Sequence, residues 1–292
     1  MDSGNIGFVL LCAAFVFVMT PGLAMFYGGL VRKKNVVNTM MTSIFIIGVG
    51  IVMWVLFGYS LSFAPSGNAF IGDFRWLGLE GVSLTEGYTD DASIPNMVFS
   101  AFQMMFAVIT PALITGAVAG RMKFKSIFVF TIFWSLIVYY PLAHMVWGQG
   151  GLLGADGIGA LDFAGGDVVH ISSGVSALVL CILLGKRHDY EHSIYRIHNI
   201  PTVVLGASLL MFGWFGFNAG SALAADGLAA HAFMTTGVSA AAAMLSWMLC
   251  DVIKNKKPTL IGASTGMVAG LVGITPGAGF VPMWAAVIIG LT

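Results

Sequence analysis

Long apolar runs alternate with short polar segments along the whole chain. A helix rises about 1.5 Å per residue and the hydrocarbon core of a bilayer is about 30 Å thick, so a run of about 20 apolar residues can cross it. Runs of this kind cover residues 6–30, 38–62, 95–120, 126–149, 163–185, 200–224, 228–250 and 259–275. The pattern predicts about eight complete transmembrane helices, and the start of a ninth near residue 282.

Composition agrees with this pattern. Hydrophobic residues make up 58% of the chain and charged residues 9%, against about 25% charged in a soluble domain. We therefore predict an all-α polytopic membrane protein in which residues 1–292 form a single membrane domain surrounded by lipid. The net charge is zero, which argues against a nucleic-acid partner because such proteins carry a basic stripe. The 38 glycines indicate close packing between helices.

Lysine and arginine are confined almost entirely to alternate loops. Three follow each of the first, third, fifth and seventh runs, which accounts for twelve of the 13 in the chain. These are Arg32, Lys33, Lys34, Arg121, Lys123, Lys125, Lys186, Arg187, Arg196, Lys254, Lys256 and Lys257. The other loops are acidic, with Arg75 as their only basic residue. By the positive-inside rule the N-terminus lies outside the cell.

The end of the chain breaks the pattern. Helix-breaking residues fill 275–282 and only about ten residues follow, half of what a span needs. We expect the chain to be C-terminally incomplete. Thr110-Pro111 and Thr275-Pro276 fall in the third and eighth runs. This five-run offset is compatible with inverted five-helix repeats whose helices are interrupted at matching positions.

Ionisable residues inside the runs are rare. No lysine or arginine lies within a run, which excludes a Schiff-base photoreceptor and disfavours a voltage sensor. His170 lies roughly two turns inside the fifth run, where an ionisable side chain indicates a functional site. The alternative is a histidine that hydrogen-bonds between helices as part of the packing. Asp162 and Asp167 precede it near the expected helix start, where each would serve as a helix cap.

Aromatic residues gather at the outer ends of three runs. Phe102 and Phe106 are four residues apart, hence on one helix face. Trp147 ends the fourth run, and Trp214 and Phe217 precede Ser221 at the end of the sixth. An interfacial aromatic belt is the ordinary explanation for any one of them. Together with a hydroxyl they suggest a cation site instead, because ring faces attract cations.

Several motifs resemble the ammonium transporter family (Amt/Mep/Rh). They are Thr20 to Arg32, Phe102 to Ile114, His144 to Gly148, Leu161 to Ser173, and Gly213 to Ser221, in order along the chain. The resemblance implies that Trp147, Phe106 and Ser221 recruit ammonium and that Phe106 and Phe217 gate the pore. It implies further that His170 is the first pore histidine, that Asp162 is a structural acid, and that Phe102 and Trp214 support the vestibule.

The resemblance also implies a mechanism and partners. Ammonium, with methylammonium as an analogue, would lose its proton and cross as NH3, while the proton is relayed along histidines. No residue matches the family's second pore histidine, since His198 and His231 fall at the ends of runs. A homotrimer in the inner or plasma membrane is expected, with a PII-type regulator on the polar cytoplasmic loop 186–199. No enzyme activity, cofactor or metal is expected.

Two alternatives differ in class. An ammonium sensor would use the same membrane fold joined to a cytoplasmic signalling domain, and the motifs do not separate sensing from transport. A generic water or glycerol channel is disfavoured because the sequence holds no Asn-Pro-Ala pair.

Overall fold

Helices make up nearly all of the membrane domain. The computed structural model describes residues 1–65, 68–155, 157–187, 190 and 195–292. Its α-helices are α1 (Ser3–Leu30), α2 (Val36–Met53), α3 (Tyr59–Phe63), α4 (Asn96–Val118), α5 (Phe124–Trp134), α6 (Tyr140–Trp147), α7 (Ser172–Leu184), α8 (Ile200–Gly220), α9 (Gly227–Asn255), α10 (Leu260–Ile274) and α11 (Met283–Leu291). Short π-helical turns join α2 to α3 (η2, Trp54–Gly58) and α5 to α6 (η4, Ser135–Tyr139), and a third leads into α7 (η5, Gly166–Ile171).

Eight helical segments in the described parts of the chain are long and apolar enough to cross a membrane. They are Ser3–Leu30, Lys33–Phe63, Asn96–Val118, Phe124–Trp147, Gly166–Leu184, Ile200–Gly220, Gly227–Asn255 and Leu260–Gly277. The short helix α11 corresponds to the start of the ninth run. The prediction of an all-α membrane protein with eight spans is confirmed, with bounds that differ by a few residues at most ends.

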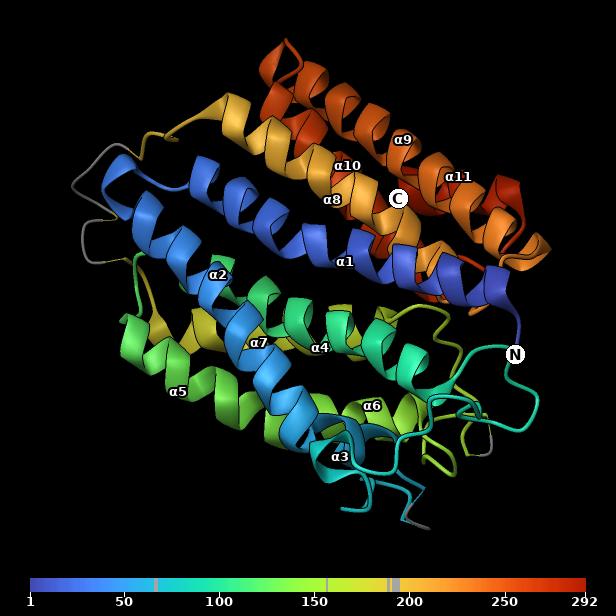
Figure 1. Ribbon diagram of the computed structural model, residues 1–292. Coiled ribbons are helices and arrows are strands. Elements are labelled where there is room, and N and C mark those ends of the chain that lie inside the picture. Colours follow the sequence, from blue (N-terminus) through green and yellow to red (C-terminus); the bar gives the residue numbers. More distant parts are fainter. Residues whose placement is uncertain (66–67, 156, 188–189, 191–194) are drawn as a thin grey trace.

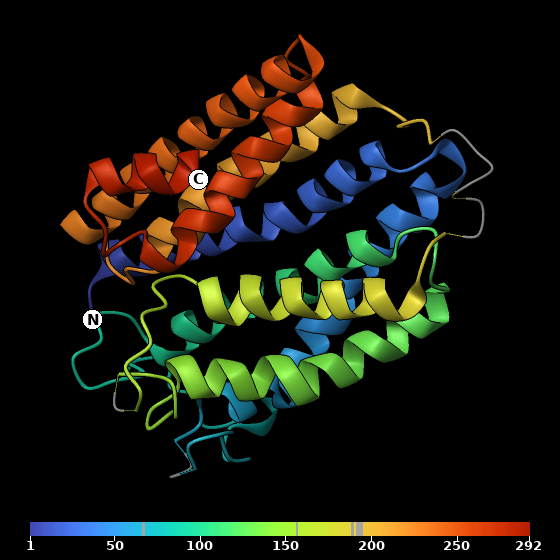
Figure 2. The same cartoon turned by 180° about the vertical axis from the view of Figure 1, so that it is seen from behind.

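The spans form two groups that lie side by side (Figures 1 and 2). One contains α8, α9, α10 and α11, and the other contains α2, α4, α5, α6 and α7. Helix α1 connects them, because it packs along α8 on one side and against α2 and α4 on the other. Phe106 lies on α4 and Phe217 on α8, and both of these helices pack against α1.

The loops at the two ends of the bundle differ in charge. At one end the basic loops meet, where Arg121 donates to the Gly185 carbonyl at 2.9 Å and the His198 amide donates to Val31 at 3.1 Å. At the other end Asn5 donates to Ser93 and accepts from the Ala225 amide, both at 2.9 Å. These contacts tie the N-terminus to the acidic end, which is the outer end by the charge rule.

The Thr-Pro pairs behave differently from one another. Pro111 lies inside α4, which runs without a break from Asn96 to Val118. Thr275 and Pro276 instead form the short 3-10 turn η6 that ends α10. Of these two spans, only the eighth shows the expected interruption. In the third span the helix continues through Pro111, because a helix packed against its neighbours tolerates the loss of one backbone donor. The inverted repeat stays a prediction.

Glycines make the contact between α1 and α8 possible. A Cβ on Gly206 would lie 2.3 Å from the Phe26 backbone nitrogen, and one on Gly213 would lie 2.2 Å from Met19 Cγ. Small residues let helix backbones approach closely, and van der Waals contact is the main attraction available to helices in lipid. This close contact fixes α8 relative to α1, and α8 carries Trp214 and Phe217.

Gly206→Ala should therefore destabilise the full-length protein. The added methyl group meets the α1 backbone, which cannot move aside as a side chain can, and such overpacking costs about 1–3 kcal/mol. Gly48→Ala is the matched control, because a Cβ there meets nothing within 4 Å and alanine favours the helix. Thermal unfolding in detergent measures both, and equal midpoints for the two variants would contradict the close packing.

Candidate functional site

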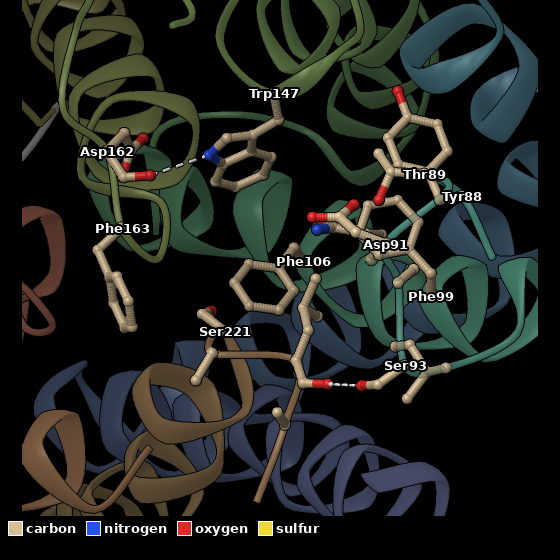
Figure 3. Close-up of a pocket in the computed structure, with 16 residues that line it drawn as sticks. Tyr88, Thr89, Asp91, Ser93, Phe99, Phe106, Trp147, Asp162, Phe163 and Ser221 are labelled. Carbon is tan, nitrogen blue, oxygen red and sulfur yellow. Dashed lines mark hydrogen bonds between the residues drawn. The ribbon is translucent and has the colours of Figure 1, made fainter. Parts of the chain in front are cut away.

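A cavity of about 460 Å³ opens at the outer end of the bundle. Residues of α4 and α6 form its walls together with residues 221–224, which follow α8, and parts of the loops around residues 88–94 and 162–163. Figure 3 shows Phe106, Trp147 and Ser221 around one space, with Tyr88, Thr89 and Asp91 on one side and Phe163 on the other. The three residues expected to recruit a cation thus lie together, although they are up to 115 positions apart in the chain (Phe106 to Ser221).

Phe106 forms the floor of this cavity and packs against Phe217, with the two rings tilted by 37° to one another. The ring centroids of Phe106 and Phe217 are 4.3 Å apart, and both side chains are buried. The rings of Trp147 and Phe106 are perpendicular, edge to face, with centroids 6.0 Å apart. The ring centroids of Phe102 and Phe106 are 4.9 Å apart, and Phe102 is not among the residues that line the cavity. Phe102 therefore supports the floor from within the helix packing.

His170 lies beneath this floor. Its ring stacks on Trp214 at 5.2 Å and on Phe217 at 5.9 Å between centroids. Nε2 of His170 is buried and has no hydrogen-bond partner among the described residues. A histidine that served only to join helices would use such a nitrogen in an interhelical bond. Trp214 thus packs against the histidine and not in the outer cavity, and it donates to Thr275 Oγ1 at 2.9 Å.

A second cavity, of about 700 Å³, continues from His170 toward the basic end. Tyr27, Leu113, Ser173 and Tyr195 are among its lining residues. The outer and inner cavities are therefore separated by the Phe106–Phe217 contact, with His170 on the inner side. His198 and His231 belong to neither cavity as these are described, and His231 Nε2 instead contacts the Val281 carbonyl at 2.8 Å.

Asp162 organises the start of the helix that carries His170. Its carboxylate accepts the backbone N–H groups of four consecutive residues, 165 to 168, at 2.6, 2.6, 2.8 and 3.1 Å. The first N–H groups of a helix have no partner within the helix, and the helix dipole favours a negative charge there. The Asp162 carbonyl also accepts Trp147 Nε1–H at 3.1 Å. One residue thus positions both Trp147 and the segment that bears His170.

The structure corrects one sequence-based detail of this segment. Helical structure begins at Gly166, which places His170 about one turn after the helix start. Asp167 is not the helix cap, since Gly165 occupies that position with a left-handed φ of 112° and the Asp162 carboxylate supplies the capping bonds from outside the helix. Glycine adopts this conformation without steric cost. Leu161 to Gly165 therefore form a capping loop, which apolar periodicity cannot distinguish from the helix that follows.

The sequence argument missed part of the outer cavity. Tyr88 stacks on Phe99 with centroids 4.7 Å apart, and both rings line the cavity. Burial raises the pKa of Tyr88 to about 12, so this ring is uncharged at neutral pH. Gln103 also lines the cavity. The sequence could have identified Gln103 as a lining residue, because it lies three residues before Phe106 and residues at this spacing share a helix face.

Comparisons with known proteins agree with this arrangement. A family model described as Ammonium Transporter Family matches residues 7–292. An ammonium transporter of Bacillus subtilis is 53% identical over 291 residues, which cover 100% of this chain and 70% of that protein. The crystal structure of Saccharomyces cerevisiae Mep2 superposes with a TM-score of 0.90 at 39% identity, over 100% of this chain and 65% of that one.

A further solved structure is described as a sensor Amt protein. It matches with a TM-score of 0.88 at 29% identity, over 99% of this chain and 72% of that one. Across the curated relatives described, the chain spans between 58% and 71% of their length.

Asp162→Asn should destabilise the full-length protein and reduce the function of its site. An amide offers one acceptor oxygen and turns a donor group toward two of the N–H groups, so we expect a loss of about 2–3 kcal/mol in unfolding free energy. Asp226→Asn is the control, because Asp226 accepts a single N–H at the N-cap of α9 and asparagine caps equally well. Unfolding in detergent measures the unfolding free energy of both variants. If Asp162→Asn has the unfolding free energy of the wild type, the four hydrogen bonds contribute little to stability.

Proposed function

Because this chain belongs to the ammonium transporter family, we propose that the full-length protein carries ammonium across a cell membrane, the inner or plasma membrane. The observation that supports this best is the Phe106–Phe217 contact, with an aromatic cavity above it and His170 below it. We infer a path that admits a cation into the outer cavity and is apolar at the Phe106–Phe217 contact. Such a path suits a solute that can be charged outside and neutral inside.

The first step is binding of NH4+ in the outer cavity. The rings of Trp147 and Phe106 meet at 89°, so a cation in the corner between them contacts aromatic surface from two directions. Ser221 donates its hydroxyl hydrogen to the Phe217 carbonyl at 2.9 Å. Its oxygen is left with lone pairs only, and it therefore accepts an N–H from the ion.

The second step is loss of a proton at the phenylalanine pair. A charged group leaves water for an apolar site only at high cost, while a neutral amine does so far more readily. We propose that NH4+ releases a proton at this point and that NH3 passes between Phe106 and Phe217. The proton is conserved, and it crosses separately along a route that includes the imidazole of His170. An imidazole both donates and accepts protons near neutral pH.

Sensing is the second candidate function. The similarity to a protein described as a sensor Amt protein favours it, although at lower identity than the transporters. A sensor would bind ammonium in the same outer cavity without net movement to the other side. Vesicles that contain the full-length protein separate the two, since a transporter gives ammonium-evoked current and methylammonium uptake, whereas a pure sensor gives neither.

Assembly and regulation are proposed from the family. We expect a homotrimer with one pore in each subunit, and a PII-type regulator on the cytoplasmic loop 186–199. Lys186, Arg187 and Arg196 give this loop its positive charge. The sequence of this loop also contains His188, Asp189, Glu191 and His192, which lie outside the described residues.

Trp147→Leu and Ser221→Ala should each weaken ammonium binding about ten-fold. Each removes one contact to the cation, worth about 1–2 kcal/mol. Ser246→Ala is the control, because this serine also donates to a carbonyl, that of Leu291, but lies away from the outer cavity. The half-saturating ammonium concentration of the evoked current measures the effect. If neither cavity variant shifts it, these residues do not recruit the ion.

Substitution of His170 should change which ions carry current across the membrane. His170→Ala should leave a folded trimer with little ammonium-evoked current, because the proton route is broken. His170→Asp places a fixed acid in the pore, where it holds a hydrated cation, so potassium should begin to carry current. His198→Ala is the control in the inner loop. Recordings with matched ammonium and potassium gradients decide the matter, and wild-type behaviour of both His170 variants would assign this residue to packing alone.

A further inference from the structure

His144 lies in the last turn of α6, and its side chain is completely buried. Its ring contacts two backbone carbonyls. Nδ1 lies 3.1 Å from the carbonyl oxygen of Ser62, and Nε2 lies 2.8 Å from the carbonyl oxygen of Asn68. Both distances are those of a hydrogen bond. The imidazole therefore bridges the end of α3 and the loop that follows it, and both of its partners are groups that can only accept.

A neutral imidazole cannot satisfy both contacts. It carries one N–H, and its second nitrogen presents a lone pair, which would face the lone pairs of a carbonyl oxygen at hydrogen-bond distance. Such a contact is repulsive, and it leaves a buried acceptor without a donor, which is costly. An imidazolium ion carries an N–H on each nitrogen and donates to both carbonyls.

The position of the ring also favours a positive charge. Helix α3 ends the second span, α6 ends the fourth, and the two helices pack against each other (Figure 1). The C-terminal end of a helix carries a partial negative charge, because its last carbonyls have no partner within the helix. Ser62 is the last residue but one of α3, and His144 lies in the last turn of α6. A cation at this point is stabilised by both helix ends.

Carboxylates do not supply the partner for this charge. In the described part of the chain the polar contacts of the imidazole are the two carbonyls. Asp73, in the loop after α3, pairs with Arg75 at 2.6 Å, and the Asp162 carboxylate accepts four backbone N–H groups. The other titratable side chains on α6 and on the helical elements packed against it, none of which is a partner of His144, are those of Tyr59, Tyr139, Tyr140, Asp167 and His170.

The loop that the imidazole holds also contacts the segment beyond α6. The Leu152 amide donates to the Ala69 carbonyl at 2.9 Å, and Ala69 adjoins Asn68. Trp147 ends α6 three residues after His144. The loop after α3 is thus joined to the chain before Trp147 by the imidazole and after Trp147 by a backbone hydrogen bond.

We propose that His144 carries a proton on both ring nitrogens, and that this imidazolium ion is a positioning residue for Trp147. It holds the end of α3 and the loop at residue 68 against the end of α6, and so fixes the point from which the Trp147 indole extends into the outer cavity. The inference rests on the proposed function for the role of Trp147, whereas the protonation of His144 stands independently of it.

The protonation is tested on the full-length wild-type protein, uniformly isotope-labelled and reconstituted in lipid. Solid-state NMR assigns the His144 signals through the backbone of Ala143 and Met145, so this measurement needs no variant. We expect two protonated ring nitrogens at neutral pH. A spectrum in which one of the two nitrogens is unprotonated would overturn the proposal.

His144→Gln in the full-length protein in liposomes tests the positioning role. The half-saturating ammonium concentration of the evoked current should rise about five-fold, less than for Trp147→Leu, because the indole is displaced and not removed. In the Trp147→Leu background the same substitution should have no further effect on half-saturation, because it acts through the indole. His231→Gln is the matched control, since His231 contacts a single carbonyl and does not line the outer cavity.

If His144→Gln does not assemble, His144→Asn replaces it, because its shorter amide keeps a donor group in a smaller volume. A half-saturation equal to wild type, or an effect that adds in full to that of Trp147→Leu, would overturn the positioning role. A wild-type protein that gives no ammonium-evoked current would instead overturn the proposed function, and the NMR spectrum would still decide the protonation of His144.

Discussion

The capping of one helix by the Asp162 carboxylate fixes the outer cavity and the segment that carries His170 relative to each other. The first N–H groups of a helix have no partner within it, and each is costly if it is left unpaired. Asp162 pairs four of them, and its own carbonyl holds the Trp147 indole. The amide of the next residue, Phe163, donates to the Pro276 carbonyl at 3.0 Å. The outer cavity, the histidine segment and the eighth span are thus fixed to one another at this point.

The same contacts leave the Asp162 carboxylate little capacity for a further partner. A carboxylate with four N–H partners has its charge compensated locally, so it does not attract a second positive group as a free acid would. The outer cavity is lined by ring faces, by hydroxyl and amide groups, and by the exposed carboxylate of Asp91.

The sequence predicted the parts of this structure that follow from periodicity and charge. The eight spans, and the placement of Trp147 and Ser221 at the same end of the bundle, needed only run lengths, basic loops and residue types. The role of Phe102, the position of Trp214 under His170 and the stacking of Tyr88 on Phe99 depend on how helices and loops from distant parts of the chain meet. Periodicity assigns a residue to a helix face but does not say which other helix that face will contact.

Two buried polar atoms without a partner among the described residues lie on opposite sides of the Phe106–Phe217 contact. Gln103 lines the outer cavity and His170 lines the inner one, and the atoms concerned are Gln103 Oε1 and His170 Nε2. An amide oxygen can only accept a hydrogen bond, whereas an imidazole nitrogen either donates or accepts according to its protonation. Under the proposed function, the ion would reach the outer cavity first, and the imidazole would follow on the inner side of the aromatic contact.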